Sequence, residues 1–282
     1  MLTAILAGVL ALGMQQQQMD TTFAVRAGGA LQLDAMNGSV TIDTWDRNAM
    51  RVQARHGRST EIEIDRRGSD VSIDMDYRGA PQSVAFAITV PRSYSVEIDG
   101  LNLGITVDGV RGSVTLENVD GSIVVRGVTG DVDVESVSGS ILIENVTGDI
   151  SVESVNQAIR VNNSRGRIEA ETVNGSIVMR GVDATSVEAS TVNGVVEYIG
   201  TIRDDGRYFL GTHNGRITMG VPERTNARIA ISTRNGRVES EFPLRMTDSS
   251  GGDFSFTLGS GSARVALESY NGTVNLVRPG GR

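Results

Sequence analysis

Residues 119–154 read VDGSIVVRGVTGDVDVESVSGSILIENVTGDISVES, and this stretch decides the fold. Cut every nine residues, it gives four blocks with Val at the first position, Gly at the third and apolar residues at the fifth and seventh. The alternation is typical of a short β-strand, and the glycine is typical of a corner with unusual dihedral angles. The frame extends over 110–200, with one ten-residue block at 182–191. Because so short a repeat cannot bury its own apolar face, the blocks must stack on one another.

The outward positions indicate how many blocks make one coil. Every second block is similar at its sixth position, which gives one set of mostly apolar residues and one set of polar residues. The two sets are Val124, Leu142, Arg160 and Val178, and Thr115, Asp133, Ser151 and Glu169. Stacked neighbours should resemble one another, so we predict coils of about 18 residues, with two strands in each. The expected fold is all-β: a parallel β-solenoid (a single-stranded β-helix) with flattened two-sheet coils about 4.8 Å apart.

The ends of the chain are less regular. Leu2–Met14 is an uncharged apolar run, which predicts a signal peptide or N-terminal export segment over 1–18. We expect one β-solenoid domain over 19–282, with irregular coils at 19–109 and 201–282 around the regular repeats at 110–200. Segments 56–60, 77–83 and 245–262 should be loops, and Pro279 with the terminal glycines should close the last edge of the stack.

Composition excludes several kinds of chemistry. The chain has no cysteine, which rules out disulfides, thiolate metal sites and a thiol nucleophile, and its only histidines are His56 and His213. We expect no cofactor and no metal site. A net charge of −8 argues against a nucleic-acid partner. No segment after the first 18 residues approaches the roughly 20 apolar residues of a membrane helix, so we expect no transmembrane span in the mature chain. The predicted location is the periplasm, the cell envelope or the extracellular space.

The chain resembles the bacterial repeat family of unknown function DUF4097, whose members often carry the label "putative adhesin". The resemblance rests on the apolar start, the run GSVTIDTWDR at 38–47, the V-x-G-S-I-x-V repeats and the run SYNGTVNL at 269–276. It covers nearly all of the mature chain. It implies a β-solenoid in or outside the cell envelope and implies no catalytic residues.

One sheet of the predicted solenoid should be acidic. Its outward carboxylates are Glu117, Asp131, Asp133, Glu135, Asp149, Glu153, Glu169 and Glu171. Four of these residues should form one column with a spacing of about 4.8 Å: Glu117, Glu135, Glu153 and Glu171. At that distance two unit charges repel by roughly 1 kcal/mol in water. The face is then a solvated surface, a site for divalent cations or a site for a basic partner. The calcium β-roll is unlike this sequence, because its second glycine and following aspartate are missing.

The other sheet should carry an apolar column. It contains Val124, Leu142 and Val178, interrupted by Arg160 and flanked by Arg126 and Arg180. Contiguous apolar side chains on a surface usually mark an interface. The column is therefore covered by a loop of the same chain, contacts a second copy or a protein of the envelope, or binds an anionic glycan through its arginines.

The predicted function is that of a non-enzymatic scaffold or binding module with an adhesin-like role. The alternative is a carbohydrate-active β-helix enzyme acting on polysaccharides, since paired carboxylates can hydrolyse glycosidic bonds. Asp204 and Asp205 break the repeat, but the Asp-Asp-Gly string is typical of a turn, and His213 occupies a corner position. A catalytic pair should lie in a cleft, so this distinction can be made from the structure.

Overall fold

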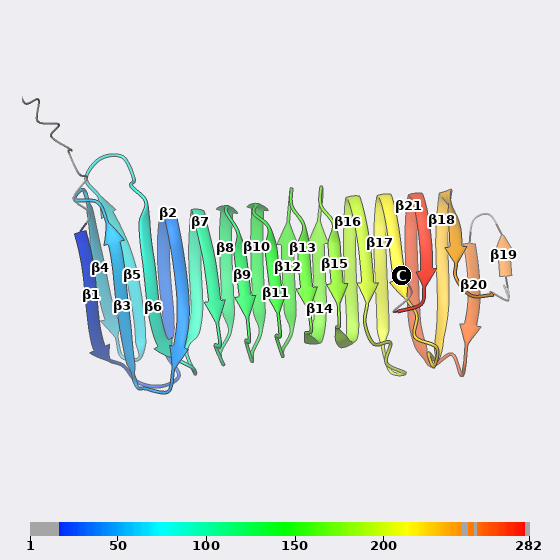
Figure 1. The fold of residues 1–282 in the computed structure, drawn as a ribbon, viewed down its shortest axis with the longest axis horizontal. Coiled ribbons are helices and arrows are strands. Elements are labelled where there is room, and N and C mark those ends of the chain that lie inside the picture. Colours follow the sequence, from blue (N-terminus) through cyan, green and yellow to red (C-terminus); the bar gives the residue numbers. More distant parts are fainter. Residues whose placement is uncertain (1–16, 244–247, 251–252, 280–282) are drawn as a thin grey trace, which may run out of the picture.

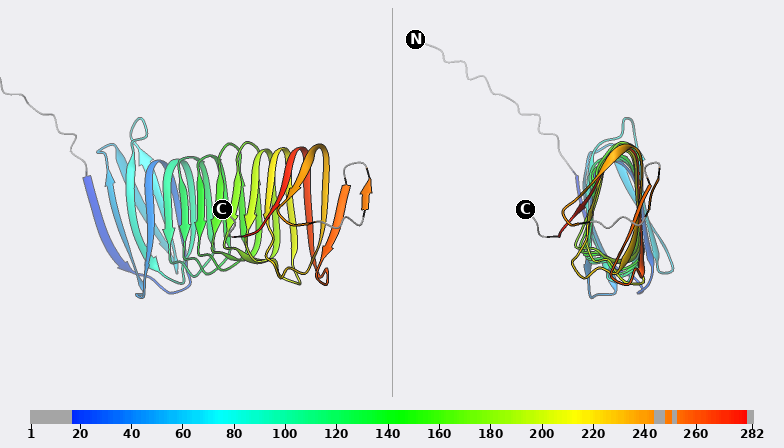
Figure 2. Two further views of the ribbon diagram at one scale, coloured as in Figure 1. Left: turned by 45° about the vertical axis from the view of Figure 1, so that its right-hand side comes forward. Right: turned by 90° about the vertical axis from the view of Figure 1, so that its right-hand side faces the viewer.

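The computed structural model describes residues 17–243, 248–250 and 253–279, and this part of the chain is all-β. Its 21 strands form one continuous network of pairings, and the same residues contain no helix. The strands stand side by side along one long axis (Figure 1), and a view down that axis shows a flattened tube (Figure 2). The prediction of an all-β protein is confirmed.

In the middle of the chain, successive strands alternate between two parallel sheets. The first sheet contains β8 (Val114–Asp120), β10 (Val132–Ser138), β12 (Ile150–Ser154) and β14 (Arg165–Thr172). The second contains β9 (Ile123–Arg126), β11 (Ile141–Glu144), β13 (Ile159–Asn162) and β15 (Ile177–Arg180). Val132 lies between Val114 and Ile150, and Ile141 lies between Ile123 and Ile159. Stacked residues are thus 18 apart in sequence, as in the contact of Ser113 with Ser95.

Alternation along each strand separates the core from the surface. In β10, Val132 and Val134 are buried, whereas Asp133 and Glu135 are exposed. The interior positions of neighbouring coils hold Val, Ile, Leu, Met and Ala, which together form one continuous core. Burying each aliphatic side chain contributes roughly 1.5–3 kcal/mol, so the protein needs no disulfide to hold the stack together.

The glycine found at the third position of most blocks is explained by the close approach of stacked corners, as Gly148 illustrates. Gly148 has φ of +155°, and a Cβ atom placed on it would lie 2.1 Å from the carbonyl oxygen of Gly130 in the preceding coil. Only a residue without a side chain fits there.

The N-terminal part contains the same two-sheet coil with a long insertion. Strands β2 (Ala30–Trp45) and β7 (Ser95–Asp108) stack in parallel, with Leu31 beside Val96 and Val40 beside Ile105. Between them in sequence lie β3 (Ala49–His56), β4 (Thr60–Arg67), β5 (Asp70–Tyr77) and β6 (Val84–Pro91). The pairs β3–β6 and β4–β5 are antiparallel, unlike the regular coils. The expected loops here are short links, because strands end at His56 and Tyr77 and resume at Thr60 and Val84.

Most of the predicted export segment lies outside the described residues. The structure begins at β1 (Gln17–Ala24), which pairs antiparallel with β3, so Gln17 and Gln18 already belong to the strand network.

The C-terminal coils are stacked out of sequence order. Strands β16 (Asp183–Ile199) and β17 (Arg207–Gly220) continue the stack in order. The last strand, β21 (Ala263–Val277), then pairs with β17 on one side and with β18 (Ala227–Ser240) on the other. The expectation that the chain terminus closes the last edge is wrong, because β18 is the outer coil and β21 lies inside it.

The segment expected to be a loop at 245–262 also contains strands. Strand β20 (Asp253–Leu258) pairs antiparallel with β18, and β19 (Asp248–Ser250) pairs with β20, while 244–247 and 251–252 lie outside the described residues. Phe256 of β20 is buried against the end of the core. Strand β20 covers the outer edge of the first half of β18, Ala227–Ser232, where an uncovered strand would invite pairing with another chain.

Candidate binding surfaces

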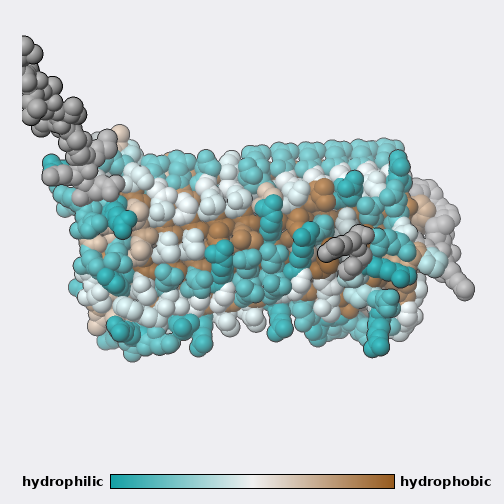
Figure 3. Space-filling model, viewed as in Figure 1, coloured by the Kyte–Doolittle hydropathy of each residue, from teal (hydrophilic) through white to brown (hydrophobic). Residues whose placement is uncertain are grey.

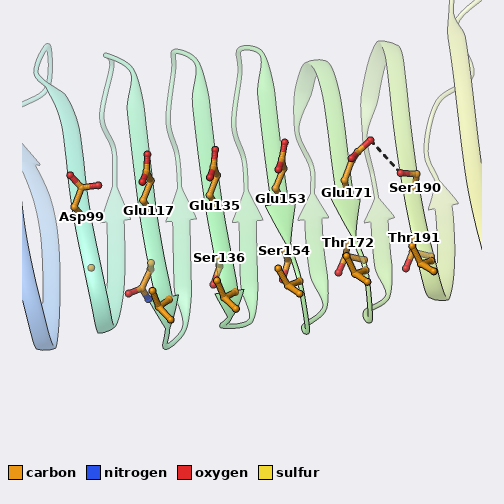
Figure 4. Close-up of a pocket in the computed structure, with 17 residues that line it drawn as sticks. Asp99, Glu117, Glu135, Ser136, Glu153, Ser154, Glu171, Thr172, Ser190 and Thr191 are labelled. Carbon is orange, nitrogen blue, oxygen red and sulfur yellow. Dashed lines mark hydrogen bonds between the residues drawn. The ribbon is translucent and has the colours of Figure 1, made fainter.

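The acidic residues predicted from the repeat lie on the outside of the first sheet. All eight are exposed, and Glu135 lies in register between Glu117 and Glu153, which in turn lies beside Glu171. Figure 4 shows these four side chains at the same height on successive strands. The prediction that these four glutamates form one column is confirmed.

The acidic column is longer than the sequence repeat indicates. Glu117 lies beside Asp99, and Asp99 lies beside Asp34. Asp74 follows Ile73, the partner of Leu33, which places its carboxylate in the same row. The nine-residue repeat does not indicate these three aspartates, because the insertion between β2 and β7 separates the stacked residues in sequence.

Asp34 is the most crowded member of the row. Burial raises the pKa of its carboxyl above the ordinary value, and a hydrogen bond to Asp99 and the negative charges of Asp99, Asp74 and Glu97 raise it further. A carboxyl between two others is harder to ionise because each neighbour repels the developing charge.

Two predicted acidic residues occupy a corner and contact the backbone of the next coil. The carboxylate of Asp131 accepts a hydrogen bond from the backbone N–H of Asp149 at 3.1 Å, and that of Asp149 accepts one from Arg167 at 3.2 Å. Asp133 and Glu169 lie between this corner and the glutamate column. Among the described residues, no group of three acidic or histidine side chains is arranged to hold a metal ion.

The predicted apolar column lies on the second sheet. Val124 is in register with Leu142, Leu142 with Arg160, and Arg160 with Val178. The three aliphatic side chains are half-buried, and Arg160 is exposed. Figure 3 shows an apolar band that runs along one face of the molecule between hydrophilic borders.

The arginines beside this column are not equivalent. Arg126 forms an ion pair with Glu144 at 3.0 Å, and Arg180 forms one with Glu197 at 2.8 Å. Hydrogen bonds from Arg126 and Asn162 hold the pKa of Glu144 below its usual range. Two of the three predicted bases therefore have carboxylate partners in this chain, which leaves less free positive charge for an anionic glycan.

A second apolar column was missed by the sequence analysis. It runs along the edge where the first sheet turns into the second, and its side chains are 39–45% exposed. We call this column the valine ridge; its members are Met36, Leu101, Val119, Val137, Val155, Val173 and Val192. Beyond Val192, the ring of His213 stacks on that of Tyr270, with 4.7 Å between their centroids.

The valine ridge and the acidic column form the two walls of a groove with a volume of about 630 Å³. The floor consists of small polar side chains that are 5–6% exposed, namely Asn118, Ser136, Ser154, Thr172 and Thr191. Figure 4 shows the acidic wall above this floor, and Ser190 Oγ at the far end donates a hydrogen bond to Glu171 at 3.3 Å. No arginine or histidine is among the described residues that line the groove.

A ladder of asparagines runs along the other side of the valine ridge. The side-chain amide of Asn174 donates to Asn156 at 3.2 Å, that of Asn193 donates to Asn174 at 2.9 Å, and that of Asn214 donates to Asn193 at 3.0 Å. These bonds link neighbouring coils beside the ridge.

The residues that break the repeat do not form a catalytic pair. Asp204 accepts hydrogen bonds from Asn226 at 3.2 Å, and Asp205 lies 3.5 Å from Arg203 in an ion pair. His213 stacks on Tyr270 on a different part of the surface. Both aspartates are exposed, so neither has the desolvated surroundings of a general acid.

Comparisons with known proteins agree with this architecture. Residues 28–277 match the family model described as Toastrack DUF4097. No curated protein shows significant similarity to the chain. In all described residues, no helix is long and apolar enough to cross a bilayer.

Two solved structures described as "putative adhesin" are similar to this chain at low sequence identity, and the first of them shares its fold. One from Parabacteroides merdae has 11% identity and a TM-score of 0.55, with 94% of this chain and 98% of the other covered. One from Parabacteroides distasonis has 9% identity and a TM-score of 0.49 over 94% and 98% of the two chains. The family match spans most of the sequence, and the chain belongs to the Toastrack DUF4097 family.

Proposed function

We propose that this protein is a parallel β-solenoid that acts without catalysis as a scaffold or binding module in the cell envelope or outside the cell. The observation that carries the proposal is the columnar surface. Exposed residues of one kind recur on successive coils, as Glu117, Glu135 and Glu153 do, and produce long uniform stripes. Such stripes suit contact with an extended partner, whereas catalysis requires a few unlike groups that converge on one point.

The location is supported by the sequence of the first residues and by the family. Leu2–Met14 has the apolar character of an export signal, and a solved structure with this fold is described as a "putative adhesin". The low identity to that structure gives the fold alone, so the adhesin-like role is part of the proposal.

The face with Val124, Leu142 and Val178 is the proposed contact surface for a protein of the envelope or a second copy of the chain. Half-buried aliphatic side chains in one column favour an apolar partner. A glycan is less favoured, because Arg126 and Arg180 have carboxylate partners. The enzyme alternative has no comparable support, since Asp204 and Asp205 are exposed turn residues.

Leu142→Asp tests this surface. The substitution places a charge in the centre of the column, and we expect it to weaken binding to an envelope fraction by about tenfold or to change the oligomeric state seen by light scattering. Thr115→Asp is the matched control, because Thr115 is also half-buried but lies on the other sheet. Circular dichroism checks that both variants fold. Unchanged scattering and unchanged envelope binding in Leu142→Asp would count against the proposed surface.

A further inference from the structure

The groove between the acidic column and the valine ridge has two unlike walls from Glu117 and Val119 to Glu171 and Val173. One wall presents a carboxylate from every coil between Asp99 and Glu171, and the other presents a valine side chain that is about two-fifths exposed. An exposed apolar column of this length is unusual on a surface and indicates a contact site. A negatively charged partner would be repelled, because the described lining includes no base.

We propose that this groove binds a basic, extended polypeptide in the polyproline II conformation, with a basic residue at every third position. The inference rests on the proposed binding function. It specifies the partner of the groove, which is a different surface from the column with Val124, Leu142 and Val178. The acidic wall favours a positively charged partner, and the valine ridge favours a partner that also carries apolar side chains.

The spacing of the groove selects this conformation. Neighbouring coils are about 4.8 Å apart, so every second carboxylate recurs at about 9.6 Å. A polyproline II helix rises about 3.1 Å per residue, and three residues advance about 9.3 Å. A β-strand repeats at about 6.8 Å and an α-helix at about 5.4 Å per turn, and both lose register with the coils within a few steps.

The threefold symmetry of polyproline II also matches the two walls. Residues i, i+3 and i+6 lie on one side of such a chain, so one side can be basic, a second apolar and a third solvent-exposed. Three basic residues would then face Asp99, Glu135 and Glu171, which belong to alternate coils. The apolar side would cover the ridge around Val119 and Val155.

The test uses the full chain and a nine-residue fluorescent probe with the sequence Arg-Val-Pro repeated three times. A second probe of the same composition has its three arginines in succession. We expect the threefold probe to bind about tenfold more tightly by fluorescence anisotropy, because only it places each arginine beside a carboxylate. Added salt should weaken its binding, since part of the wall is solvent-exposed. Equal affinity of the two probes would overturn the proposal, and so would the absence of binding.

Two variants locate the probe. Glu135→Gln removes the central charge and Val137→Ser removes part of the ridge, and each should weaken binding about fivefold or more. Asp133→Asn is the matched control, because Asp133 is exposed on the same strand but lies outside the groove, and it should change binding less than twofold. Equal losses in Glu135→Gln and Asp133→Asn would show attraction to general negative charge and would overturn the proposed site.

The outcomes also separate this inference from the proposed function. If Leu142→Asp reduces envelope binding but neither probe binds, the binding function stands and the groove proposal fails. If the threefold probe binds and Leu142→Asp changes nothing, the groove stands and the assignment of the second sheet as the contact surface fails.

Discussion

The two long edges of the flattened tube carry the same residue in opposite environments. At one edge Val110, Val128 and Val146 are at most 1% exposed, whereas at the other Val119 and Val137 are 43% and 41% exposed. All five are the first residue of a nine-residue block. The same position in the repeat thus closes the core at one edge and forms an outer ridge at the other.

The residue before each valine explains the difference. Asn145 precedes the buried Val146 and has φ of +57°, a left-handed conformation that interrupts the alternation of the strand and turns the next side chain inward. Ser136 precedes the exposed Val137, is itself buried, and continues the alternation, so that Val137 points outward. A single backbone conformation therefore decides which edge can meet a partner.

The largest expected difference between the edges comes from adding a charge to each valine. Val146→Asp places a carboxylate in the closed core and should lower the free energy of unfolding by about 4 kcal/mol or more. Val137→Asp adds the same group in contact with water and should change it by less than about 1 kcal/mol. Urea unfolding followed by circular dichroism measures both. Similar losses in the two variants would contradict the assignment of inner and outer edges.

Replacing a corner glycine by alanine should cause a smaller loss of stability, and the loss should be the same at both edges. A Cβ atom on Gly148, at the edge with buried valines, would lie 2.1 Å from a backbone oxygen, and one on Gly139, at the other edge, would lie 1.8 Å from one. Gly148→Ala and Gly139→Ala should each cost about 2–3 kcal/mol, because the backbone of the neighbouring coil must move. Gly104→Ala is the control, since no atom lies within 4 Å of its added Cβ. A tolerated alanine at either corner would show that coil spacing is less rigid than the structure implies.

The smallest predicted effect concerns the acidic row beside the outer edge. The pKa of Asp34 is raised in the folded protein, so folding favours its protonated form and its ionisation costs stability. The stabilisation of the folded state by protonated Asp34 is fully present below the unfolded pKa of about 3.9. It is lost as pH rises through the pKa that Asp34 has in the folded protein. Asp34→Asn should therefore stabilise the protein at pH 7 by less than about 1 kcal/mol, with no gain at pH 3.

Thermal unfolding of the wild type and Asp34→Asn across that pH range measures the difference. Asp43→Asn provides an exposed carboxyl outside the row as a control. A gain that persists at pH 3 would show that the effect does not come from the charge of Asp34.

The regular coils could be predicted from sequence because each outward residue repeats with the stack. Comparing Thr115, Asp133 and Ser151 with Val124 and Leu142 was enough to distinguish the two sheets. The order of the C-terminal coils could not be predicted, because β21 and β18 both match the repeat frame and either could pair with β17.

The outer ridge could have been found only in part from the residues before the valines. Gly127 and Asn145 precede buried valines and have positive φ, and Ser136 and Ser154 precede exposed ones. Asn118 precedes the exposed Val119 without a positive φ, so the residue type alone does not identify the edge. That contrast was present in the repeat, but it becomes informative only when the direction of each side chain is followed around the corner. The extension of the acidic row to Asp34 and Asp74 depends on long-range pairing, which no local pattern reports.

The uniform register of the central coils has a consequence for how such genes can change. Strands β8, β10, β12 and β14 pair with the same alignment at each step. Loss or duplication of 18 codons within this stretch would leave the valine, glutamate and glycine columns aligned on both sides of the junction. Recombination between repeats can therefore alter the length of the molecule, and with it the distance it spans, while the core residues of the remaining coils keep the same packing.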